Sequence, residues 1–194
     1  MNYLAHTFLS CKDANLLAGN FMADFIHHKE KANLKPEILL GIELHKRIDS
    51  FTDSHQDVKD TVRLLRPVQG KYTPVSVDII FDYVLTQDWV RYSSQSLSVF
   101  KQNVYKLLIE QSHHYPIKVK QRMEMMIADD FLMSCATEER LIRTFERIKK
   151  RAKFDNNFEN AHKDMYAHYD QLREHFHNFF PDLIIHVNEF CACN

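Results

Sequence analysis

Residues 41–53 read Gly-Ile-Glu-Leu-His-Lys-Arg-Ile-Asp-Ser-Phe-Thr-Asp, and they combine a helical pattern with chemically useful side chains. Ile42, Leu44 and Ile48 supply apolar positions at helix spacing. His45 and Asp49 lie four residues apart, which places them about 40° apart around a helix axis. Both side chains can therefore reach one metal ion or one phosphate group at the edge of a core.

Helical spacing of apolar residues continues through most of the chain. Only 3 glycines and 5 prolines interrupt its 194 residues, and strict alternation of polar and apolar residues is rare. A chain of this length suits one hydrophobic core, and no change in composition indicates a second domain. The sequence predicts an all-α protein, a single compact domain over residues 1–194 with about eight or nine helices.

Caps and prolines place several helices. Asp13 is typical of an N-cap, and it opens a predicted helix that ends near residues 29–31. Pro36 suits the first turn of the next helix. Thr52 and Asp53 resemble a cap, so we expect a third helix from there to about Arg66. The clearest predicted loop is 67–74, and further helices are expected over 75–92, 97–113, 117–133, 138–152 and 158–180.

Charge and hydropathy exclude several classes of partner. The 25 lysines and arginines balance 26 acidic residues, so the chain lacks the basic field typical of nucleic-acid-binding proteins. No apolar run approaches the roughly 20 residues of a membrane span. Four cysteines lack the paired spacing of zinc ribbons, and no secretory leader is recognised. We expect a soluble cytoplasmic protein that binds neither nucleic acid nor membranes.

Histidines and aspartates recur at helix spacing in the first 90 residues. Asp24 follows Asn20 by four residues, and Asp82 follows Asp78 by the same interval, while His6 stands near the start. Three packed helices can bring such pairs to one site. Mixed imidazole and carboxylate ligands suit manganese, iron, zinc or magnesium. Taken singly, each aspartate is more often a solvated or capping residue.

Bulky apolar neighbours make the metal hypothesis stronger. Asp24 follows Phe-Met-Ala and precedes Phe-Ile, and the segment between Asp78 and Asp82 reads Ile-Ile-Phe. An unpaired charge at such a core boundary costs several kcal/mol. A cation neutralises it, and so does Arg47, whose guanidinium can pair with a carboxylate or hold a phosphate.

Several segments, in order along the chain, resemble the bacterial acyl carrier protein phosphodiesterase family. They are MNYLAH at 1–6, LAGNFMADF at 17–25, GI at 41–42, HKRID at 45–49 with TD at 52–53, DIIFD at 78–82 with Trp89, and AHYD at 167–170. The resemblance implies a manganese-dependent enzyme, a divergent relative of the HD phosphohydrolases with a similar helical architecture. Its implied reaction releases 4′-phosphopantetheine from a serine of holo acyl carrier protein.

From the spacing and the resemblance together we predict the ligands and catalytic residues. The predicted metal ligands are His6, Asp24, His45, Asp49, Asp78 and Asp82. Mn²⁺ is the expected ion, and Mg²⁺ and Fe²⁺ are compatible with the same donors. Arg47 is expected to contact the phosphate, with Asp24 and Asp49 completing the catalytic set. HD enzymes use an adjacent His-Asp pair, which this chain lacks, and Tyr83 stands where the family pattern has a histidine.

Two alternatives stay open. A metal phosphohydrolase of similar architecture could act on a nucleotide or another small phosphoester. A non-catalytic helical module that only binds acyl carrier protein is a different class. If the carrier docks here, the basic residues closest in sequence to the site are Lys46, Arg47, Arg63 and Arg66, and their charge would steer an acidic partner.

Overall fold

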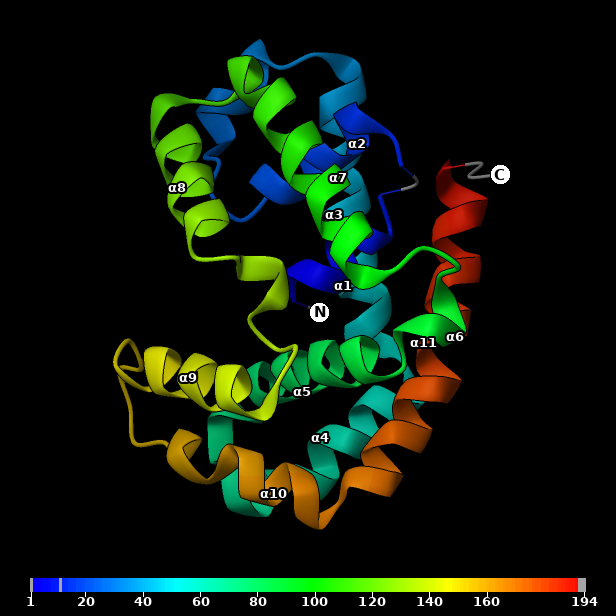
Figure 1. Cartoon of the computed structure of the whole chain (residues 1–194), viewed down its shortest axis with the longest axis vertical. Helices are drawn as coiled ribbons and strands as arrows, with labels where there is room; N and C mark the ends of the chain where they lie inside the picture. Colours follow the sequence, from blue (N-terminus) through cyan, green and yellow to red (C-terminus); the bar gives the residue numbers. More distant parts are fainter. Residues whose placement is uncertain (1, 11, 192–194) are drawn as a thin grey trace.

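Helices make up all of the regular structure in residues 2–10 and 12–191, the part of the chain that the computed structural model describes (Figure 1). The α-helices are α1 Tyr3–Phe8, α2 Ala14–Met22, α3 Pro36–Ser54, α4 Gln56–Gln69, α5 Thr73–Gln87, α6 Trp89–Tyr92, α7 Leu97–Glu110, α8 Ile117–Ala128, α9 Glu138–Lys149, α10 Ala161–Ala167 and α11 Tyr169–Cys191. Short 3₁₀ helices are η1 His28–Asn33, η2 Gly70–Tyr72, η3 Gln111–His114, η4 Phe131–Met133 and η5 Phe158–Asn160. The predicted all-α class is confirmed.

The helices form two groups with α1 between them. In Figure 1, α2, α3, α7 and α8 lie in the upper group, and α4, α5, α9 and α10 lie in the lower one. The long helix α11 runs along one side, where it packs against α3, α4 and α5. None of the described helices is both long and apolar enough to cross a bilayer.

Two glycines allow α2 and α3 to touch. A Cβ at Gly19 would lie 2.0 Å from the carbonyl oxygen of Ile38, and a Cβ at Gly41 would lie 2.4 Å from that of Leu16. Both distances are too short for a real methyl group, so only glycine permits this approach. The contact brings Asn20, the residue after Gly19, next to α3.

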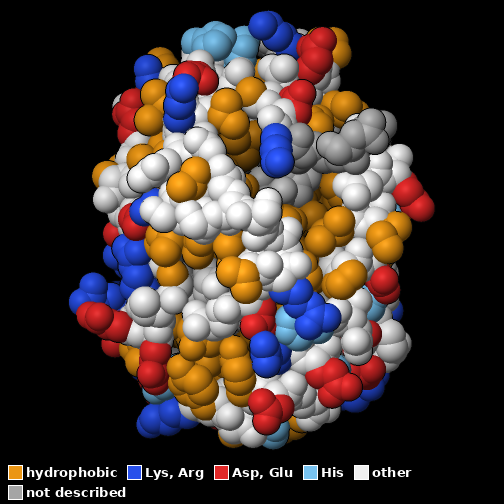
Figure 2. Space-filling model, turned by 45° about the vertical axis from the view of Figure 1, so that its right-hand side comes forward, with side chains coloured by type: hydrophobic (Ala, Val, Ile, Leu, Met, Phe, Trp, Pro, Cys, Tyr) orange, Lys and Arg blue, Asp and Glu red, His pale blue; other side chains and the backbone are white. Residues whose placement is uncertain are grey.

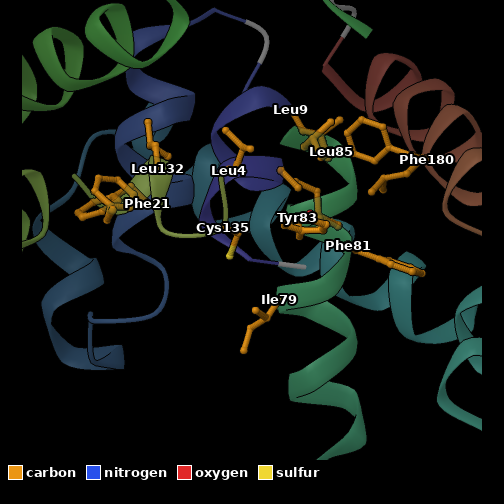
Figure 3. Packing of buried hydrophobic residues seen from close by; sticks show 14 of the residues in the cluster. Leu4, Leu9, Phe21, Ile79, Phe81, Tyr83, Leu85, Leu132, Cys135 and Phe180 are labelled. Atoms are coloured by element: carbon orange, nitrogen blue, oxygen red, sulfur yellow. The ribbon is translucent and has the colours of Figure 1, made fainter. Parts of the chain in front are cut away.

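The short helix α1 is held in place by a buried carboxylate. Asp82 of α5 is 2% exposed, and its oxygens accept hydrogen bonds from the backbone N–H groups of Leu4 (3.1 Å) and Ala5 (3.3 Å). Figure 3 shows Leu4 and Leu9 packed into the same core as Leu85 of α5. Because an α1 of 6 residues is too short to be stable alone, these contacts determine its position.

Some predicted helix boundaries are wrong. The predicted cap at Thr52 and Asp53 lies inside α3, which continues to Ser54, and His55 caps α4 by accepting a hydrogen bond from the N–H of Asp57. Thr52 instead donates to the carbonyl of Ile48 (2.7 Å), a bond that threonine makes within helices. A threonine suits both an N-cap and the interior of a helix, so residue type alone did not show which role Thr52 has.

Other boundaries differ for similar reasons. The predicted loop 67–74 is shorter, because α4 includes Pro67 in its last turns and only η2 separates it from α5. Asp13 does cap α2, accepting from the N–H groups of Asn15 and Leu16, but α2 ends at Met22 and residues 28–33 form η1. The segment 158–180 divides into η5, α10 and α11. The described residues contain eleven α-helices, more than predicted, because several are very short.

Charged side chains of both signs are interspersed over the face shown in Figure 2, with apolar side chains between them. This mixture agrees with the near-zero net charge of −1. Of the four cysteines, Cys135 and Cys191 are free thiols, and Cys11 and Cys193 lie outside the described residues.

Candidate metal centre

Three elements bring two histidines and two aspartates together. His6 lies on α1, Asp24 follows the end of α2, and His45 and Asp49 lie on α3. The Nε2 atom of His45 is 3.2 Å from an oxygen of Asp24 and 3.2 Å from an oxygen of Asp49. The Nε2 atom of His6 is 3.2 Å from the other oxygen of Asp49. We call these four residues the His-Asp cluster.

The imidazoles form the inner wall of the His-Asp cluster and the carboxylates form its outer side. The rings of His6 and His45 stack with centroids 4.2 Å apart and planes 24° apart. His6 is 5% exposed and His45 is 9% exposed. The side chains of Asp24 and Asp49 are each 44% exposed, so a ligand in solvent can reach their oxygens.

The cluster perturbs its own pKa values. Burial lowers the pKa of His6. Burial also disfavours the charged form of His45, but the hydrogen bonds that its ring donates to Asp24 and Asp49 outweigh burial and raise the pKa of His45 to about 9. Burial alone would raise the pKa of Asp49, yet its contacts with His45 and His6 hold that pKa below its usual range.

The arrangement fits a divalent cation. Ligand atoms of His6, His45 and Asp49 lie within 4.8 Å of one another. Neighbouring ligands of one octahedral ion, at bond lengths of ~2.1 Å, are themselves roughly 3 Å apart, close to the separations seen here. The buried Nε2 atom of His6 makes no regular hydrogen bond, although an oxygen of Asp49 lies 3.2 Å away. A cation at this point would satisfy that nitrogen, and the mixed nitrogen and oxygen donors suit Mn²⁺, Fe²⁺ or Zn²⁺.

Two predicted ligands lie elsewhere. Asp82 accepts hydrogen bonds from the α1 backbone instead of joining the cluster, and burial raises its pKa to about 7. Asp78, one turn earlier on α5, is half-buried, and its negative charge contributes to the raised pKa values of Asp82 and Asp53. The described group whose ligand atoms converge contains His6, His45 and Asp49, and neither Asp78 nor Asp82 belongs to it. Asp24 is also outside that group, but it lies 3.2 Å from Nε2 of His45. From its observed position Asp82 holds α1, which carries His6.

Arg47 is also directed away from the cluster. Its guanidinium carbon lies 4.3 Å from the centroid of the Phe190 ring, and its Nε lies 3.7 Å from Glu43. Two residues along a helix correspond to a rotation of about 200°, so Arg47 faces the side opposite His45. The expected contact between Arg47 and a phosphate is not supported by this geometry.

Sequence reasoning did not single out two residues near the cluster. Asn20 bonds to both histidines, and its only sequence signal was its four-residue spacing from Asp24. Arg122 of α8 lies 5.6 Å from the ring of Phe25, the neighbour of Asp24. Nothing in the sequence near Arg122 indicated this position, because the approach of α8 to the segment after α2 is a tertiary contact.

A cavity of about 680 Å³ lies apart from the cluster. Thr7, Phe8 and Ser10 line one side of it, and residues of α6 and α7 such as Tyr92 and Phe100 line the other. None of the four cluster residues is among its described lining residues. The His-Asp cluster is therefore separate from this cavity.

Comparison with known proteins places the chain in a family. A model of the acyl carrier protein phosphodiesterase family matches residues 1–183, which include the whole His-Asp cluster. The acyl carrier protein phosphodiesterase of Klebsiella pneumoniae (strain 342) is 26% identical over 185 residues, covering 95% of this chain and 96% of that protein. Those of Salmonella paratyphi A and Enterobacter sp. (strain 638) are each 24% identical with the same coverage. No solved structure matches the chain. The chain therefore belongs to the acyl carrier protein phosphodiesterase family, whose members are phosphodiester hydrolases.

Proposed function

We propose that this protein hydrolyses the phosphodiester that joins 4′-phosphopantetheine to a serine of holo acyl carrier protein, and that it needs a divalent metal. Family membership supports the class of reaction, and the His-Asp cluster supports the metal. Mn²⁺ is the first candidate, with Mg²⁺ and Fe²⁺ compatible with the same donors. The carrier protein is used in fatty acid biosynthesis, and we place the enzyme in the cytoplasm with it.

In this proposal His6, His45, Asp24 and Asp49 hold the cation. A divalent cation held there supplies a water of lowered pKa and neutralises charge on the phosphoryl oxygens. The exposed carboxylates of Asp24 and Asp49 face the solvent side, where one of them can orient the attacking water and accept its proton.

The atoms balance without a protein nucleophile. The water oxygen forms a bond to phosphorus as the bond from phosphorus to the serine oxygen breaks. The serine oxygen takes a proton, and the products are apo acyl carrier protein and 4′-phosphopantetheine. Departure of the serine needs charge stabilisation, because an alkoxide is a poor leaving group.

Basic residues close in sequence to the centre would steer an acidic carrier, although Arg47 itself faces away from the cluster. Lys46 and Arg47 are exposed on α3, and Arg63 and Arg66 are exposed on α4. These charges would act mainly on the rate of encounter. Salt weakens their attraction to the carrier, because at 0.1 M ionic strength charges are screened beyond about 10 Å. We expect kcat/KM to fall as salt rises, and an unchanged kcat/KM would argue against this docking mode.

One experiment tests the reaction. Purified protein is stripped of metal, reloaded with Mn²⁺ or left with chelator, and incubated with holo acyl carrier protein. Intact-mass spectrometry should show loss of the phosphopantetheine arm only in the metal-loaded sample. The exposed Ser50→Ala variant should behave as the wild type, and Asp49→Asn should lose turnover.

A panel of nucleotides and small phosphoesters runs beside the carrier. Hydrolysis of a nucleotide with no action on the carrier would favour a different metal phosphohydrolase. Stable binding of the carrier without any turnover under every metal condition would favour a binding module and contradict the proposal.

A further inference from the structure

Asn20 occupies a buried position between the two histidines. Its side chain is 1% exposed and stands at the close contact between α2 and α3. The amide nitrogen Nδ2 lies 2.9 Å from the carbonyl oxygen of His6 and 3.1 Å from the Ser10 hydroxyl. A carbonyl oxygen only accepts, so the group facing it must be the NH₂ of the amide. The orientation of the Asn20 amide is thereby determined.

The amide oxygen of Asn20 faces both imidazoles. Its Oδ1 lies 2.9 Å from Nδ1 of His6 and 3.0 Å from Nδ1 of His45. The backbone oxygen of Asn20 also lies 3.0 Å from Nδ1 of His45. Each of these oxygens is only an acceptor, so both Nδ1 atoms must carry a proton and donate.

Protonation at Nδ1 has a consequence at the other side of each ring. In a neutral imidazole with a proton on Nδ1, the lone pair is on Nε2. The Nε2 atoms of His6 and His45 are the atoms that face Asp49 and Asp24. A lone pair beside carboxylate oxygens is unfavourable unless a proton or a metal ion lies between them.

We propose that Asn20 is a positioning residue that holds both histidines in the Nδ1–H tautomer, so that their Nε2 atoms are presented together to a divalent cation. The amide oxygen sets the tautomer of His6, and the same oxygen together with the backbone oxygen of Asn20 sets that of His45. The two ligands are thus oriented as one unit by a residue that does not itself touch the metal. This inference rests on the metal centre of the proposed function, but its principal measurement needs neither substrate nor turnover.

The direct test is NMR of the histidine ring nitrogens. Long-range ¹H–¹⁵N spectra of metal-free protein, and of protein loaded with Zn²⁺ as a diamagnetic probe, report which ring nitrogen carries the proton. The Nδ1 atoms of His6 and His45 should be protonated in the Zn²⁺-loaded sample at pH 6 to 8. The metal-free sample is also recorded above pH 9, because below its pKa of about 9 the His45 ring carries a proton on both nitrogens. An unprotonated Nδ1 in either ring of the wild type would overturn the inference, whatever the variants do.

Variants separate positioning from a general structural role. Asn20→Leu removes the amide oxygen, which is the acceptor for His6 and one of two acceptors for His45, and it leaves the backbone oxygen of residue 20 facing His45. The Nδ1–H signature should therefore be lost at His6 first. Mn²⁺ affinity, measured by electron paramagnetic resonance, should fall by about 10- to 100-fold, as when other groups that orient metal ligands are removed. Asn20→Asp keeps an acceptor oxygen, so the Nδ1–H signature should persist even if the protein is less stable. Loss of that signature in a folded Asn20→Asp protein would contradict the inference.

Thr52→Val is the matched control. Thr52 is 2% exposed on α3, and its hydroxyl bonds only within that helix, to Ile48. The variant should lose stability without any change in tautomer or Mn²⁺ affinity. If Asn20→Leu behaved in the same way, Asn20 would be an ordinary buried polar residue. Correct tautomers and tight Mn²⁺ binding without carrier hydrolysis would instead retain this inference and reject the proposed function.

Discussion

Gly19 of α2 and Gly41 of α3 face each other where the two helices touch, and a Cβ added at Gly41 would lie 2.9 Å from the Cα of Gly19. This contact has a functional consequence because Asn20 follows Gly19 and His45 lies one turn after Gly41. Separation of the helices would break the hydrogen bond between Asn20 and His45. The two glycines therefore set the geometry of the His-Asp cluster without contributing a polar side chain.

Gly19→Ala should destabilise the protein by about 3 kcal/mol, near the upper end of the usual cost of overpacking. The new methyl would meet the backbone carbonyl of Ile38 at 2.0 Å, and a backbone oxygen cannot move aside as a flexible side chain does. Urea unfolding of the metal-free protein measures the change. Ser50→Ala, on the exposed side of α3, should change stability by less than about 0.5 kcal/mol. Equal stability of the two variants would show that the helices separate easily.

Asp49→Asn should weaken Mn²⁺ binding more than Asp24→Asn does. Asp49 contacts both His6 and His45, whereas Asp24 contacts only His45. We expect a loss of about 100-fold or more for Asp49→Asn, since removing a ligand exceeds the effect of removing an orienting group. Calorimetric titration with Mn²⁺ measures both affinities.

Asp53→Asn is the control for charge in that experiment. It removes one exposed carboxylate from the same helix, one turn after Asp49 and outside the His-Asp cluster. Mn²⁺ affinity should change little. A loss as large as that of Asp49→Asn would mean that general negative charge, rather than ligation, attracts the metal.

Stability of the metal-free protein should decrease with rising pH as His45 loses its proton. The pKa of His45 is raised to about 9 in the folded protein, against ~6.5 in an unfolded chain. Its contribution is therefore fully present below pH ~6.5 and is lost as pH rises through about 9, with an upper limit of roughly 3 kcal/mol. Urea unfolding with chelator present, at a series of pH values, measures this trend.

Mn²⁺ affinity should change in the opposite direction over the same pH range. The cation and the proton compete for Nε2 of His45, so affinity should rise as that proton leaves. In Asp49→Asn one of the two negative charges that favour protonated His45 is missing, and the pH dependence of stability should be weaker. Stability that rises between pH 6.5 and 9 in the chelated wild type would contradict this assignment.

Asp82→Asn should impair the metal centre indirectly. The new amide would place an NH₂ group against one of the backbone N–H groups of Leu4 and Ala5, which costs about 1–3 kcal/mol for a buried unsatisfied donor. Since α1 carries His6, Mn²⁺ affinity should fall together with the order of α1. Hydrogen exchange should become faster at the amides of Leu4 and Ala5. Unchanged protection of these amides, with lost metal binding, would indicate a direct role for Asp82 at the metal.

The helical class and part of the site were predictable because they depend on local spacing. His45 and Asp49 lie on one face of α3 simply because a helix has about 3.6 residues per turn. Asp13 caps α2 as expected, since an N-cap acts on the residues next to it. The same rule, applied carefully, also places Arg47 on the opposite side of α3, away from the cluster.

Residues with two local roles were harder to assign. Thr52 suits both a cap and a helix interior, and only the packing of α3 against its neighbours decides between them. The Asp78 and Asp82 pair has the spacing of ligands, yet the fold places the N-terminus of α1 against Asp82, and the carboxylate binds backbone N–H groups instead. The spacing of two residues along a helix gives no information on which other element packs against that face of the helix.

The sequence by itself determined that this chain is helical, that it contains histidine and carboxylate groups at helix spacing, and which family it resembles. Tertiary structure alone decided which of those groups meet, because His6, Asn20, Asp24 and His45 come from separate elements whose approach depends on packing. The contact at Gly19 and Gly41 and the anchoring of α1 by Asp82 set that approach. The local periodicity of the sequence decides which residues share one face of a helix. Which helix faces meet depends on how the whole core packs.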